Sequence, residues 1–132
     1  MIAQLIRPRK ISRDDFIAFL SARKNRSIYL QPYPGNAGDD LIRQGSEILL
    51  QVLGIKQVAD PERADIILIP CGNQTMWRSN LRIWEACWQR WPKTEFVIGP
   101  ATFQGEQYPW RAMLAQSSAN IAGLFARDPV SH

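Results

Sequence analysis

The sequence predicts an α/β fold, in which helices cover the faces of a parallel β-sheet. Short apolar segments alternate along the chain with segments whose apolar residues recur at helical spacing, which is typical of this class. The strongest apolar segment, DIILIP at residues 65–70, is unbroken, as expected for a strand buried on both faces of such a sheet. The chain has 132 residues, 45% of them hydrophobic, which is enough for one domain with about five strands.

The first expected elements are a helix over residues 12–24 and a strand over residues 27–31. Ser12 can serve as the N-cap of the helix, and Phe16 and Leu20 fall on one of its faces. The strand, SIYLQ, is short and largely apolar.

A turn-rich loop, 32–40, with two prolines and two glycines, follows the first strand. A second helix is expected from Asp39 or Asp40, because apolar residues then recur at helical spacing as far as Gly54. Gly54 occupies the position of a C-terminal helix glycine. Residues 55–59 are expected to form a weak second strand.

The C-terminal half continues the alternation of strands and helices. A tryptophan-rich stripe, with apolar residues every three or four positions and Pro92 beyond it, predicts a helix over 80–91 and its burial in the core. Further elements are expected at 95–99 (strand), 109–118 (helix) and 122–126 (strand). The expected order of strands across the sheet is 55–59, 27–31, 65–70, 95–99, 122–126.

Charge is unevenly distributed along the chain. Residues 1–26 hold seven Lys and Arg side chains against two Asp, whereas the whole chain holds 16 basic and 12 acidic side chains. This divides the chain into a basic N-terminal helical arm, 1–26, and a lobe, 27–132. Such an arm is either a solvated helix or a contact for an anionic partner. We expect no nucleic-acid partner, because the sequence contains no RNA-binding, zinc-finger or helix-turn-helix pattern.

Cysteine and histidine usage excludes several kinds of site. Cys71 and Cys87 are too few for a disulfide framework, and His132 is the only histidine, so no metal site and no catalytic triad are expected.

No apolar run approaches the ~20 residues of a membrane span, and the first ten residues do not form a secretory signal. The expected location is the cytoplasm.

Three unusual loops follow expected strands, at 34–40, 70–74 and 99–104. Since parallel strands end at one edge of a sheet, we expect these loops to converge there on one cleft. The first loop suits an anion, because glycines permit close approach of the backbone and a helix begins beside them. It matches neither the Walker nor the dinucleotide-binding glycine pattern, so no nucleotide cofactor is expected.

The candidate site residues come from these loops and from the end of the last strand. Asp39 is the candidate catalytic residue, as a general base, although an aspartate at a helix start also serves as an ordinary cap. The candidate substrate-binding residues, each with an alternative role in a turn or a local ion pair, are Asn36, Gly38, Asp40, Gly72, Asn73, Trp77, Thr102 and Arg127.

Four sequence blocks in order resemble the polysaccharide pyruvyl transferase family. They are PGNAGDDLI at 34–42, DIILIPCGN at 65–73, FVIGPATF at 96–103 and LFARDPVS at 124–131. The resemblance implies an enzyme that transfers pyruvate from phosphoenolpyruvate to a sugar of an exopolysaccharide or cell-surface glycan precursor. It implies no cofactor besides this donor substrate, and an acceptor that is a sugar or a lipid-linked saccharide.

The family resemblance also implies two Rossmann-like lobes around a cleft, as in GT-B glycosyltransferases, of which this chain resembles the N-terminal one. The basic residues and the histidine that bind phosphoenolpyruvate are expected in the second lobe, outside these 132 residues. We therefore expect an acceptor-side lobe that is inactive alone and needs a second lobe or subunit, in the cytoplasm or at the inner face of the membrane. The alternative is a non-catalytic Rossmann-like binding or scaffold domain.

Overall fold

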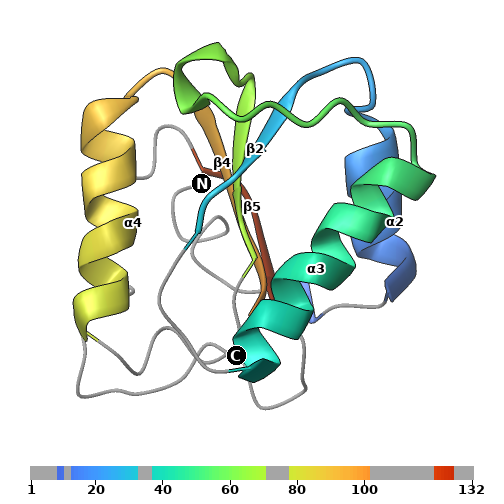
Figure 1. The fold of residues 1–132 in the computed structure, drawn as a ribbon, viewed down its shortest axis with the longest axis horizontal. Coiled ribbons are helices and arrows are strands. Elements are labelled where there is room, and N and C mark those ends of the chain that lie inside the picture. The colour runs from blue at the N-terminus through green and yellow to red at the C-terminus, as the bar shows by residue number, and fades with distance from the viewer. Residues whose placement is uncertain (1–8, 11–12, 33–36, 71–77, 102–120, 127–132) are drawn as a thin grey trace.

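The computed structural model describes residues 9–10, 13–32, 37–70, 78–101 and 121–126. Their strands form one sheet, seen edge-on between the helices in Figure 1. Every strand pair is parallel, and the order is β1-β5-β4-β3-β2. The four main strands are β2 (Ile28–Leu30), β3 (Ile66–Ile69), β4 (Glu95–Ala101) and β5 (Ile121–Ala126). The expected α/β class is confirmed, and the architecture is compatible with a Rossmann-like fold.

The edges of the sheet differ from the expectation. The segment 55–59 forms no strand, only a single bridge between Gln57 and Ile28 on the outer side of β2. Only Ile55 of this segment is buried, and the 3₁₀ turn η1 (Pro61–Arg63) follows soon after it. The segment therefore buries too little apolar surface to favour longer pairing with β2. At the opposite edge the two-residue β1 (Arg9–Lys10), which the sequence did not predict, pairs with β5.

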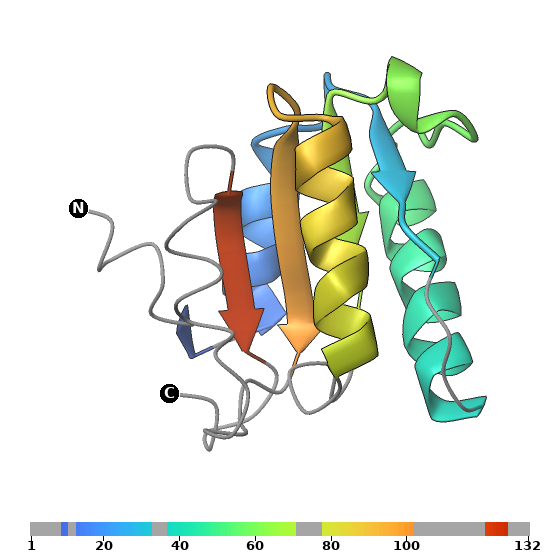
Figure 2. The same ribbon diagram turned by 90° about the vertical axis from the view of Figure 1, so that its left-hand side faces the viewer.

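One face of the sheet is covered by α4 (Arg78–Arg90), as Figure 2 shows. Trp84 and Trp88 of this helix are buried against alternate residues of the strands, including Ile67 and Phe96. Trp91, just beyond the helix, is partly buried against the same cluster. The predicted burial of the tryptophan stripe is therefore confirmed.

The other face is covered by α2 (Arg13–Ser21) and α3 (Ala37–Val52), which lie opposite α4 in Figure 1. Their buried residues Phe16, Leu20 and Leu50 pack against the remaining strand residues, among them Ile66 and Leu68. Three expected helices are thus confirmed, with small differences at their ends, whereas the expected helix at 109–118 lies outside the described residues.

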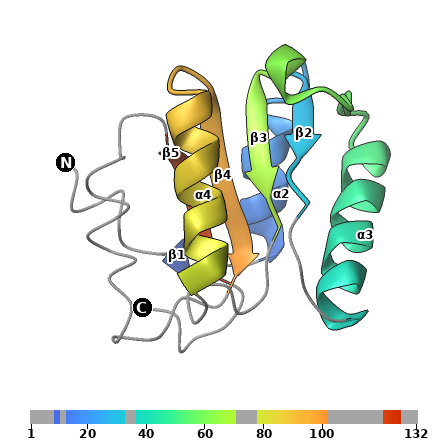
Figure 3. The ribbon, with the colours of Figure 1, turned by 60° about the vertical axis from the view of Figure 1, so that its left-hand side comes forward.

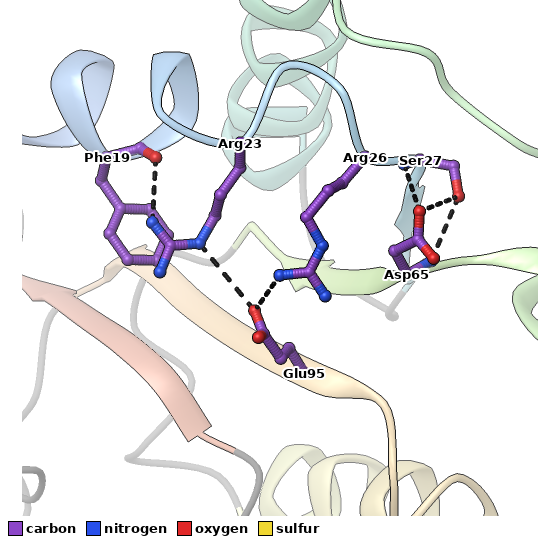
Figure 4. Close-up of polar contacts among 6 residues, drawn as sticks. All are labelled: Phe19, Arg23, Arg26, Ser27, Asp65 and Glu95. Atoms are coloured by element: carbon purple, nitrogen blue, oxygen red, sulfur yellow. Dashed lines mark hydrogen bonds and ion pairs between the residues drawn. The ribbon is translucent and has the colours of Figure 1, made fainter.

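Helix α2 belongs to the basic arm, yet it contributes to the main core. Two of the arm's arginines also have structural partners at the amino ends of the strands (Figure 4). The guanidinium groups of Arg23 and Arg26 lie 3.9 Å and 2.9 Å from the same Oε2 atom of Glu95. Arg23 also donates a hydrogen bond to the carbonyl of Phe19 and stacks 3.6 Å from the centre of its ring. These two charges therefore connect the arm to β4.

Two glycines hold backbone conformations that other residues rarely adopt. Gly54 has φ +71° directly after α3, which confirms its predicted role at the end of that helix. Gly99, buried in β4, has φ +125°, and a Cβ atom there would collide with the carbonyl oxygen of Phe125 in β5. The pairing of β4 with β5 shifts register between Ile98 and Ala101, so Gly99 permits an irregularity at the carboxyl end of β4.

We predict that Gly99→Ala lowers the free energy of unfolding by about 3 kcal/mol or more, because it combines backbone strain with a backbone collision. Gly45→Ala is the matched control, since a Cβ at this exposed position inside α3 has no atom within 4 Å. The control should gain about 0.5–1 kcal/mol from helix propensity. Urea denaturation of both variants at low protein concentration measures the difference, and equal stabilities would contradict the role of Gly99.

Candidate functional site

The carboxyl ends of the strands form one edge of the sheet, because all strand pairs are parallel. Figures 2 and 3 show β4 and β5 ending there, with the first turns of α3 and α4 beside this edge. Helix N-termini carry free backbone N–H groups and the positive end of the helix dipole. The first turn of α4 holds no acidic residue and suits an anion, whereas Asp39 and Asp40 in the first turn of α3 would compete with an anion and suit hydroxyl groups.

The first turn of α3 places three of the predicted site residues at this edge. Gly38, Asp39 and Asp40 lie inside the helix, which begins at Ala37, two residues before the earlier of its predicted starts. The side chain of Asp40 is exposed. Carboxylates in a first helical turn are stabilised by the helix dipole. The position of these aspartates is therefore consistent with a structural role and with a catalytic role.

The other predicted site residues lie outside the described part of the chain. They are Asn36, Gly72, Asn73, Trp77, Thr102 and Arg127. Of the three expected loops, the structure describes the start of α3, the buried Pro70 after β3, and Gly99 with the two residues after it. These segments follow or end neighbouring strands. The convergence of the complete loops on one cleft stays a prediction.

The irregular end of β4 is a feature of this edge that the sequence reasoning missed. Gly99 and Pro100 lie between the paired residues Ile98 and Ala101, and the ladder resumes with Ala101 beside Ala126. The dipeptide Gly-Pro was the available signal, since glycine and proline inside an apolar strand often mark a bulge. The collision that a Cβ at Gly99 would cause ties this irregularity to β5.

A cavity of about 320 Å³ lies at the other end of the sheet. Its lining includes Ser27, before β2, and residues of the turn around η1, among them Lys56, Asp60 and Arg63. The side chain of Arg63 is 83% exposed, and its guanidinium lies 3.9 Å from the Asp60 carboxylate. This cavity is open to solvent and lies at the opposite end of the strands from the predicted site. None of the predicted site residues lines it.

Other reactive chemistry is sparse in the described residues. No group of three His, Cys, Asp or Glu side chains that could hold a metal ion occurs among them. None of the helices in these ranges is both long and apolar enough to cross a membrane. Cys87 is a free, buried cysteine, and burial raises the pKa of its thiol to about 11. Such a thiol is a poor nucleophile near neutral pH.

We predict that native Cys87 resists alkylation by iodoacetamide at pH 8 and reacts once the protein is unfolded, as peptide mass spectrometry would show. The folded state holds the thiol proton more tightly than the unfolded state. The contribution of Cys87 to stability is therefore complete below about pH 9 and is lost as the pH rises toward about 11.

Cys87→Ala is the control for this pH dependence. Urea unfolding should show a steeper loss of stability between pH 9 and 11 for the unchanged protein than for the variant. Rapid alkylation of Cys87 in the native protein, or identical pH profiles for the two proteins, would contradict the burial of the thiol.

Comparisons with known proteins identify no relative: no family model, no curated protein and no solved structure matches the chain.

Proposed function

We propose that the chain is the acceptor-side lobe of an enzyme like the polysaccharide pyruvyl transferases. In this role it contributes to the transfer of pyruvate from phosphoenolpyruvate to a sugar of an exopolysaccharide or cell-surface glycan precursor. One observation carries the proposal: each of the four family-like blocks follows a main strand of the sheet or overlaps one. The first block follows β2, the second contains β3, and the third and fourth begin inside β4 and β5.

The position of the blocks matters because ligands of open parallel sheets bind beyond the carboxyl ends of the strands. In sequence, the last three blocks continue beyond the carboxyl end of their strands, and the first block opens α3. This order along the chain supports the proposal of a single binding edge to which all four blocks contribute. A Rossmann-like lobe of a GT-B-like enzyme is the finer fold that we propose on the same ground.

The proposed chemistry requires positive charge around the donor. A proton adds to the methylene carbon of phosphoenolpyruvate, two sugar hydroxyl oxygens bond to the adjacent carbon, and the bond from that carbon to the phosphate oxygen breaks. One of the two hydroxyl protons compensates for the proton taken up by carbon, and the other leaves on the phosphate. Cations must stabilise the departing phosphate. Arg23 and Arg26 cannot serve here, because they pair with Glu95 at the amino ends of the strands.

The placement of Arg23 and Arg26 away from the carboxyl edge supports an acceptor-side role for the chain. In that role Asp39 would accept a proton from an attacking hydroxyl, and the polar loop residues would orient the sugar. A second lobe or subunit would supply the cations and close the cleft against water. The alternative is a non-catalytic binding or scaffold domain, which is favoured by the ordinary, dipole-stabilising position of Asp39 and Asp40 in the first turn of α3.

We predict that the 132-residue chain alone releases no phosphate from phosphoenolpyruvate in the presence of a mixed pool of sugars and lipid-linked saccharides. Joined to, or mixed with, a second lobe encoded downstream or in an adjacent gene, it should turn over. Released phosphate is measured colorimetrically, and mass spectrometry detects the pyruvate ketal. Turnover by the chain alone would refute the need for a second lobe, and an inactive complete complex would favour the scaffold alternative.

A second prediction concerns Asp39 in the complete enzyme. Asp39→Asn keeps the size and polarity of the side chain but removes its charge and basicity, so kcat should fall by about 100-fold or more if the carboxylate accepts a proton. Glu47→Gln is the matched control, since it removes a carboxylate from the same helix about two turns beyond Asp39, and it should retain most of the turnover rate. Circular dichroism of both variants checks the fold. Full activity of Asp39→Asn would leave this residue with a structural role only.

A further inference from the structure

Helix α3 carries an apolar stripe that the described fold leaves uncovered. Its large members, Leu41, Ile48 and Val52, are 68%, 59% and 77% exposed, and Gly45 between them is exposed as well. We call these four residues the α3 stripe. The opposite side of the same helix faces the core, where Ser46 and Leu50 are buried. One helix therefore presents apolar residues both to the sheet and to solvent.

The spacing within the α3 stripe is that of a helix–helix seam. Its members follow one another at intervals of four, three and four residues, the alternation found at the contact positions of coiled coils. At about 100° per residue they fall within an arc of about 60°. Two exposed glutamines, Gln44 and Gln51, border the arc on one side, as polar residues border a contact surface.

We propose that the α3 stripe binds the same stripe of a second copy of this chain, with the two helices antiparallel. The stripe is complementary to itself in this orientation. A two-fold axis midway between residues 45 and 48 sets Gly45 opposite the partner's Ile48 and Leu41 opposite the partner's Val52. The glycine leaves a gap, since a Cβ there would meet no atom within 4 Å, and an isoleucine side chain of the second copy can fill it.

The charges around α3 also favour the antiparallel orientation. Asp40 is exposed in the first turn of the helix, and Lys56 is exposed shortly after its end. Antiparallel pairing brings Asp40 toward the partner's Lys56 and aligns the helix dipoles favourably. A parallel pair would instead place the two Asp40 residues together and the two Lys56 residues together.

The size of the stripe sets the expected strength of the dimer. The 16 residues of α3 span about 24 Å, so the contact is smaller than the ~800 Å² per partner of a standard stable interface. Association is therefore expected only at micromolar concentrations or above. The inference does not depend on pyruvyl transfer, because it uses no residue of the proposed reaction except Asp40, and that residue only for its charge.

Sedimentation equilibrium of the unmodified chain between about 10 µM and 1 mM tests the proposal, because a small interface should associate in this range. The chain should change from monomer to dimer over this range, and Ile48→Glu should weaken the dimer at least about tenfold. Ala86→Glu is the matched control, since it places the same charge on an exposed position of α4. A monomer at every concentration, or equal effects of the two variants, would overturn the proposal.

A charge exchange tests the orientation. Asp40→Lys and Lys56→Asp should each weaken the dimer, and the double variant should restore it, because the exchanged pair regains opposite charges across an antiparallel contact. Circular dichroism confirms that each variant is folded. Failure of the double variant to recover association would overturn the antiparallel pairing. Association that Ile48→Glu leaves intact would place the contact elsewhere and overturn the use of α3.

Discussion

The burial of β3 on both of its faces is the constraint on which the rest of the structure depends. All four residues of this strand are fully buried: Ile67 and Ile69 pack toward α4, and Ile66 and Leu68 pack toward α2 and α3. A strand with two apolar faces needs a cover on each, so it requires helices on both sides of the sheet. It also needs a neighbouring strand on each side, which β2 and β4 provide.

The sequence was most informative where burial decides the structure. An unbroken apolar run identified β3, and tryptophans at helical spacing identified α4 and its buried face, because these patterns reflect the core directly. It was less informative at the sheet edges. Residues 9–10 form a strand only because they pair with β5, which is distant in the sequence. Residues 55–59 include β-forming residues but bury little apolar surface, and they form only a single bridge. No local pattern records such long-range pairing.

The candidate site was predictable to a different extent. The shared edge of the parallel strands followed from the alternation of strands and helices, but the chemistry depends on side chains in loops, whose conformation is not set by periodicity. Asp39 illustrates the difficulty, because a carboxylate in the first turn of α3 suits both a role in stabilising the helix dipole and a role as a base. The requirement for glycine at position 99 could not be predicted either. It comes from the carbonyl oxygen of Phe125, a residue that is distant in the sequence.

The two ends of the sheet have different roles in this picture. At the amino ends, charged and polar groups contact one another. Glu95 pairs with Arg23 and Arg26, while Ser27 and Asp65 exchange backbone-to-side-chain hydrogen bonds of 2.9 Å and 3.1 Å (Figure 4). These contacts connect α2, β2, β3 and β4 without using the carboxyl edge. The structural function of the sheet and its proposed binding function are thus separated along the length of the strands.

The pairing of β1 with β5 has a consequence for how the protein is made. Arg9 lies beside Phe125 and Lys10 beside Ala126, so the earliest described strand pairs with the latest. During translation residues 9–10 therefore cannot form this edge ladder until residues 121–126 have been synthesised. Until then, β4 remains an open sheet edge in the nascent chain, and chaperones that shield such edges would have the longest opportunity to act there.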